Sequence, residues 1–102
     1  AALSGKAIAP YTDLLLHDLG PELADRDLQG RPLPSRWRTA PLWGMSTALE
    51  DGREVRLLHD GRARGVEEAI LWHGGSASAA RERYRQLDAE ARQRLLGWVS
   101  AL

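Results

Sequence analysis

The sequence predicts an all-α fold that is rich in loops, with three helices in its C-terminal half. Apolar residues recur at helical spacing from Val66 to the end of the chain, and stop signals separate them into segments. Turn-forming residues dominate the stretch from Gly20 to Pro34. The length of 102 residues corresponds to one small domain, or to part of one.

The three C-terminal helices are predicted from their apolar faces and end signals. The first spans residues 66–73 and carries His73 on its apolar side, and Gly74-Gly75 ends it. Ser76 is the expected N-cap of the second helix, and Asp88 is the expected N-cap of the third. The faces of these two helices are formed by Ala77, Ala80, Tyr84 and Leu87 and by Ala91, Leu95, Trp98, Val99 and Leu102.

The N-terminal half gives weaker signals. A short helix is expected within residues 7–19, ended by Gly20-Pro21, and a second one within residues 39–49. Residues 20–38 are predicted to form a long irregular connection, of the kind that wraps a partner or a cofactor. Turns are expected at residues 51–52 and 60–61, and residues 55–58 are expected to be extended or irregular.

Composition excludes several classes of function. The 14 basic and 14 acidic side chains give no net charge, which argues against a protein that binds nucleic acid through its phosphates. The chain has no cysteine, so it contains no disulfide, no thiolate metal site and no C-x-x-C-H motif for covalent haem attachment. No apolar run approaches the 18 residues that indicate a membrane span.

His73 is the first candidate for chemistry, because an imidazole on the buried side of a helix needs a partner other than water. Three interpretations remain open: a core histidine bonded to the backbone, a ligand of haem iron or another metal, and an acid–base group. Acid–base catalysis is weakened because no serine or carboxylate stands in a recognisable relation to His73.

The other candidates have simpler explanations beside the functional ones. His59 is either a locally bonded turn residue or a group close to the site of His73. His17 is expected at the surface or at a helix end, and Met45 in the core, although a thioether can also bind haem iron. Tryptophan is frequent for this length and suits either a core or the wall of a planar cofactor. The four tryptophans are Trp37, Trp43, Trp72 and Trp98.

Two further hypotheses follow from the residues alone. A small metal site could use His59, His73 and a carboxylate such as Asp60 or Glu67, although zinc usually takes three or four ligands. Alternatively, the chain is a cofactor-free helical interaction module, in which the last two helices bind a partner protein.

Three segments of the chain resemble the C-terminal part of the bacterial di-haem oxidoreductases, a family also called di-haem peroxidases or thiol oxidoreductases. The family is similar to the di-haem cytochrome c peroxidases. The segments occur in the family's order, and a helix containing Leu95-Leu96 follows them. They are residues 8–20 (IAPYTDLLLHDLG), 37–44 (WRTAPLWG) and 58–75 (LHDGRARGVEEAILWHGG).

The resemblance implies a loop-rich cytochrome-c-like fold, in which residues 1–102 form the C-terminal part of a single haem domain. The C-x-x-C-H motif that attaches haem c would then lie upstream, so this part alone would hold no covalent haem and would not be active. His73 occupies the position of the distal axial ligand, which is methionine in the cytochrome c peroxidase relatives. Two axial imidazoles would give a lower reduction potential than a histidine and methionine pair.

The resemblance also implies an environment for this domain. The expected cofactor-binding residues are His73, His59, Trp72 and Trp43, and His73 is the expected metal ligand. The expected partners are haem, the upstream haem domain and a small redox protein, with no nucleic acid and no membrane span. The implied function is electron transfer within a periplasmic, peroxidase-like oxidoreductase.

Overall fold

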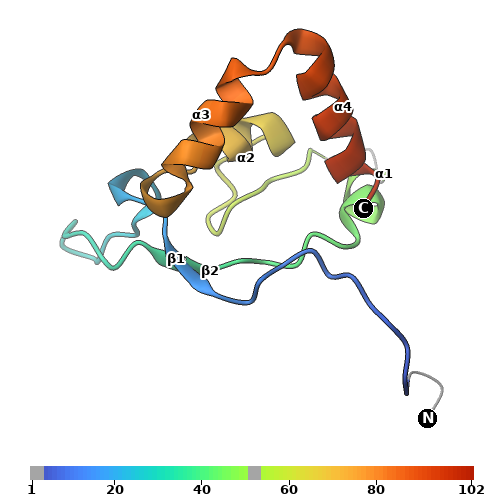
Figure 1. Cartoon of the computed structure of the whole chain (residues 1–102). Coiled ribbons are helices and arrows are strands. Elements are labelled where there is room, and N and C mark those ends of the chain that lie inside the picture. The colour runs from blue at the N-terminus through green and yellow to red at the C-terminus, as the bar shows by residue number, and fades with distance from the viewer. Residues whose placement is uncertain (1–3, 51–53) are drawn as a thin grey trace.

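The computed structural model describes residues 4–50 and 54–102 (Figure 1). Short helices and two very short strands alternate with long connections. In chain order the elements are strand β1 (Leu16–Asp18), 3-10 helix η1 (Pro21–Leu23), strand β2 (Arg36–Arg38), helix α1 (Met45–Glu50), helix α2 (Val66–Trp72), 3-10 helix η2 (Gly75–Ala77), helix α3 (Ser78–Gln86) and helix α4 (Ala89–Ser100).

The prediction of an all-α fold is wrong, because β1 and β2 form a two-stranded antiparallel sheet. His17 pairs with Trp37 at the centre of this sheet, and Leu16 and Asp18 pair with Arg38 and Arg36. The architecture is therefore mixed, with four α-helices and a small sheet in the described part of the chain. The irregular connection expected over residues 20–38 consequently contains η1 and ends in β2.

The helix expected within residues 7–19 does not form. Side chains at its expected start bond to the backbone instead, since Leu14 N donates to Thr12 Oγ1 at 3.0 Å and Leu15 N donates to Asp13 Oδ1 at 2.9 Å. Such local bonds compete with the helical pattern. Tyr11 and Leu14 also have positive φ angles of 54° and 59°, and a right-handed helix cannot contain them.

The three expected C-terminal helices are present (Figure 1). Asp88 is confirmed as the N-cap of α4, since its Oδ1 accepts a bond from Ala91 N at 2.7 Å. The expected cap at Ser76 is wrong: this residue lies in η2, and α3 has Ala77 as its N-cap without a side-chain bond. The expected turn at residues 51–52 lies outside the described residues. The turn expected at residues 60–61 is present one residue earlier, at 59–60, and is closed by a bridge between Leu57 and Ala63.

Helices α3 and α4 form a hairpin at the top of Figure 1, with α2 between their open ends and the sheet on the other side of α2. Both α1 and α2 contact α4, and β1 contacts η2. The N-terminal segment runs away from this body along one side. These contacts bring the end of α2, which carries His73, against the end of β1.

Little of the described chain is buried. The fully buried apolar side chains are those of Leu23, Ala63 and Tyr84, whereas many large apolar side chains are exposed. The radius of gyration is 15.5 Å, compared with about 13 Å for a compact domain of this length. The open shape leaves apolar surface available for a further partner. The exposed side chains include Ile8, Tyr11, Leu14, Leu15, Leu16, Trp43, Leu71 and Trp98.

Candidate functional site

Helix α2 places His73 and is held at its N-terminal end by polar contacts. Its N-cap is Gly65, which provides no side-chain bond. Glu68 ties the first turn of α2 to the residue before the N-cap, because its Oε2 accepts a hydrogen bond from Arg64 N at 2.9 Å. This bond lowers the pKa of the Glu68 carboxyl, so the negative charge is retained at the positive end of the helix dipole.

His73 is the C-cap residue of α2, one position beyond the last helical residue, Trp72. Its Nδ1 lies 2.6 Å from the carbonyl oxygen of Ala69. A carbonyl can only accept, so Nδ1 carries the proton and the neutral ring has its lone pair on Nε2. Nε2 has no hydrogen-bond partner among the described residues, and the ring is only half-buried.

This arrangement is compatible with two of the interpretations drawn from the sequence. The His73 ring is bonded to the backbone, as a core histidine would be, but only through one of its nitrogens. Histidines that bind metals typically donate the second ring N–H to a carbonyl or carboxylate, which fixes the tautomer and the orientation of the ring. The geometry of His73 is therefore compatible with both interpretations, because its Nε2 has no hydrogen-bond partner among the described residues.

Two charged side chains contact Trp72, one at the indole nitrogen and one over the ring. Its Nε1 lies 3.4 Å from Glu68 Oε1, and the guanidinium of Arg62 lies 4.9 Å from the ring centroid. Arg62 is fixed in turn, since its Nε donates to Asp60 and its Nη1 donates to Glu22 O, both at 2.6 Å. The Asp60-Gly61 turn is thus joined to the end of α2 through a cation–π contact.

His59 belongs to a separate cluster. Its ring stacks on Trp37 with 3.8 Å between centroids and a 17° angle between the planes. Its Nε2 lies 2.9 Å from Asp25 Oδ1, and only 18% of the His59 side chain is exposed. Trp37 is anchored by a bond from its Nε1 to Leu23 O at 2.9 Å. Both the ring face and Nε2 of His59 are therefore engaged with protein groups.

The small metal site proposed from the sequence is not formed by the described residues. Within residues 4–50 and 54–102, no group of three or more His, Cys, Asp or Glu side chains is placed to hold a metal ion. His59 bonds to Asp25 and His73 bonds to Ala69, so each imidazole has its own partner. An ion held only by this chain's own side chains is thus unsupported.

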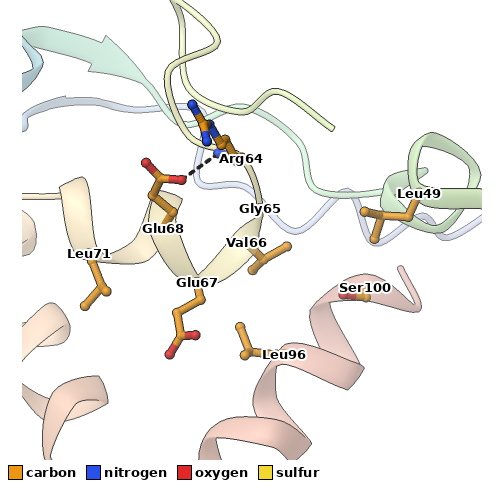
Figure 2. Close-up of a pocket in the computed structure, with 9 residues that line it drawn as sticks. All are labelled: Leu49, Arg64, Gly65, Val66, Glu67, Glu68, Leu71, Leu96 and Ser100. Carbon is orange, nitrogen blue, oxygen red and sulfur yellow. Dashed lines mark hydrogen bonds between the residues drawn. The ribbon is translucent and has the colours of Figure 1, made fainter. Parts of the chain in front are cut away.

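A groove of about 540 Å³ lies between α2, α4 and α1 (Figure 2). Val66 and Glu67 project from α2 toward Leu96 of α4, and the dashed line marks the bond between Glu68 and Arg64. None of the four cofactor-binding residues expected from the sequence lines this groove. The lining residues are Leu49, Arg64, Gly65, Val66, Glu67, Glu68, Leu71, Leu96 and Ser100.

The remaining candidates form no hydrogen bond with His73 in the described part of the chain. Trp43 has 53% of its surface exposed and precedes α1. Met45 begins α1 and is half-buried. His17 lies in β1 rather than at a helix end, and its Nε2 is 2.6 Å from Asp13 Oδ2 in a partly exposed pair.

Several groups that shape the site were not identified from the sequence. Tyr84 is buried, and its hydroxyl donates to Glu67 Oε1 at 2.9 Å. Burial and the neighbouring Glu67 carboxylate together raise the pKa of the Tyr84 phenol. The sequence pattern also predicts no role for Arg62, and it predicts only a helix end at Gly74-Gly75. The signal available was the helical face of Tyr84, which predicted burial but not a partner.

Comparison with known proteins identifies the class to which this chain belongs. A family model described as "Di-haem oxidoreductase, putative peroxidase" matches residues 1–102, so the chain belongs to the di-haem oxidoreductase family. No curated protein and no solved structure gives a match. Within the described residues, no helix combines the length and apolar character needed to cross a membrane.

Proposed function

We propose that this chain is a haem-binding electron-transfer domain and that Nε2 of His73 is an axial ligand of a haem iron in the intact protein. The observation that carries the proposal is the 2.6 Å contact between His73 Nδ1 and Ala69 O. It leaves the Nε2 lone pair available and holds the ring in one orientation. The family of the chain supplies the cofactor class, a haem.

When bound, haem provides an iron centre that gains and loses one electron at a time. The role of His73 is to hold its lone pair toward the iron, and the role of Ala69 is to retain the proton on Nδ1 and make the ring more basic. A more basic imidazole stabilises the ferric state, which lowers the reduction potential. If a second histidine also held the iron, the potential would lie below that of a histidine and methionine pair.

Other residues are proposed to surround the cofactor without binding iron. Trp72 directly precedes His73, and the exposed face of Trp43 suits a flat apolar ring. By its likeness to the family, His59 is proposed at the edge of the haem, and it is not proposed as an iron ligand because its Nε2 is bonded to Asp25. The exposed apolar side chains would pack against the cofactor and the upstream part of the protein, which the low burial of this chain supports.

For the intact protein we propose a peroxidase-like oxidoreductase of the periplasm that carries haem c and exchanges electrons with a small redox protein. Family membership supports the oxidoreductase class. The cysteine-free chain supplies no covalent attachment of its own. This domain alone would then be inactive, because the C-x-x-C-H motif that attaches haem c would lie outside this cysteine-free chain.

The test replaces His73 in the intact haem protein. H73A is expected to abolish the low-spin visible and electron paramagnetic resonance signals of one haem, while the haem itself stays attached. H17A is the matched control, since it removes a partly exposed histidine that is paired only with Asp13. An H73A protein with the low-spin signals of the wild type would contradict the ligand assignment.

A further inference from the structure

We infer that Gly74 and Gly75 are positioning residues for His73. They form a close backbone crossing with the end of β1, and this crossing sets the place from which the imidazole projects. The inference rests on the proposed function, because the consequence of the crossing is the orientation of an iron ligand.

The crossing leaves no space for a side chain at Gly75 and very little at Gly74 and Gly20. A Cβ atom on Gly75 would lie 2.3 Å from Asp18 O and 2.7 Å from Gly20 N. A Cβ atom on Gly74 would lie 3.0 Å from Leu19 O, and one on Gly20 would lie 3.0 Å from Gly75 N. Each of these neighbours is a backbone atom, which cannot move aside as a flexible side chain can.

The opposite side of the crossing is held rigidly. Leu19 N donates to Ser35 O at 3.0 Å, which extends the pairing of β1 with β2 by one residue. Asp18 Oδ1 accepts bonds from Gly20 N and from the hydroxyl of Ser35. These two bonds lower the pKa of the Asp18 carboxyl, so the charged form that makes them persists. The end of β1 is therefore a fixed surface for the turn after His73.

Packing of α2 alone cannot fix the position of His73 as closely as the backbone crossing does. The helix has seven residues, and none of them is fully buried. A helix this short is marginal without tertiary contacts. The residue after His73 is tied directly to β1, because Gly74 N donates to Leu19 O at 3.1 Å. The imidazole is thus fixed between α2, through Ala69, and β1, through Gly74.

Close approach, and not turn geometry, explains the glycine at position 74. Gly75 has a φ of +52°, which by itself favours glycine. Gly74 has a φ of −128°, a value open to any residue, so it is the tight contact with Leu19 O that disfavours a side chain there. Substitution of Gly74 therefore tests the backbone crossing itself, without a change in turn geometry.

The experiment compares three glycine variants in the intact haem protein. G74A and G75A are expected to lose the low-spin signal of the haem that His73 binds, with G75A losing more because its Cβ would make the shorter contacts. G30A is the matched control, since Gly30 has a φ of +77° and nothing within 4 Å of its Cβ position. G30A shares the backbone strain of G75A without its clash, and it should keep the wild-type signal.

Added imidazole separates a displaced ligand from a collapsed domain. If the glycines position His73, free imidazole restores the low-spin signal in G74A and G75A, because the haem site is intact and lacks only its ligand. Signals that are lost and not restored would overturn the inference, since the crossing would then stabilise the whole domain. Wild-type signals in both variants would also overturn it. The proposed function fails separately, through an unchanged signal in H73A.

Discussion

The hydroxyl of Tyr84 lies 2.9 Å from Oε1 of Glu67 and links α3 to the first turn of α2. Tyr84 is the only fully buried residue of the three C-terminal helices in the described chain. The guanidinium of Arg92 lies 5.7 Å from the centroid of the same ring. The phenol therefore connects α2, α3 and α4 at one point, which makes it a sensitive probe of how the helix that carries His73 is held.

Y84F is expected to lower the free energy of unfolding by about 1 kcal/mol, because it removes one hydrogen bond to a carboxylate that is itself exposed. Urea denaturation of this chain measures the change. E90Q is the control, since Glu90 pairs with Arg94 on the surface and its loss should cost less than about 0.5 kcal/mol. Equal effects of the two substitutions would mean that the Tyr84–Glu67 bond contributes nothing specific.

D88A is expected to lower the free energy of unfolding by about 1 kcal/mol, because the bond from Ala91 N to the Asp88 carboxylate caps α4. S76A is the matched comparison. The sequence predicts an N-cap at Ser76 as it does at Asp88, but the Ser76 hydroxyl caps neither η2 nor α3 in the structure. S76A should therefore change the stability by less than about 0.5 kcal/mol in thermal or urea unfolding. A larger loss for S76A than for D88A would contradict the observed helix start.

Asp13 is expected to titrate with a pKa of about 2, well below the ordinary aspartate value of 3.8. The backbone bond from Leu15 is the largest cause, followed by bonds from the side chains of Thr39 and His17. A pKa that is lower in the folded chain stabilises it above the unfolded value, and this stabilisation is lost as the pH falls from 3.8 toward 2. Carboxyl carbon shifts measured by NMR follow the titration directly.

The Thr39 variant tests the assigned cause of that shift. T39V should raise the Asp13 midpoint toward 3.8 while the bond from Leu15 N at 2.9 Å keeps part of the shift. A midpoint near 3.8 in the unmodified chain would show that the Asp13 carboxylate does not accept these bonds in solution.

H59A is expected to lower the free energy of unfolding by about 1 kcal/mol through loss of the stack on Trp37. D25N keeps the stack and should cost less, since the Asp25 side chain is 47% exposed. In the intact haem protein, both variants should retain the low-spin signal, because His59 Nε2 is already bonded to Asp25. Loss of that signal in H59A would identify His59 as an iron ligand and would contradict the proposed assignment.

Part of the candidate site could be predicted because its signals are local. The face that contains Val66, Ala69 and Ile70 determined that α2 forms and that His73 lies at its end. The cap at Asp88 was predictable for the same reason, since donor and acceptor are three residues apart. The bond from His73 to Ala69 is also local, but helical spacing alone could not show which nitrogen makes it.

The remaining features depend on residues that are distant in the sequence. The pairing of Leu16 with Arg38 could not be predicted from either segment alone, because cross-strand bonds are made only when the two segments meet. The stack of His59 on Trp37 likewise joins two segments that are distant in the sequence, and helical periodicity within either segment could not predict it.

Local bonding therefore made the C-terminal helices and the place of His73 at the end of α2 predictable from the sequence alone. The motifs that resemble the di-haem family were also visible in the sequence. Only the tertiary structure decided that β1 forms and that its end lies against Gly75. The physical reason is the range of the forces involved. Helix periodicity and caps act within one or two turns, whereas a backbone crossing exists only after two distant segments have been brought into contact.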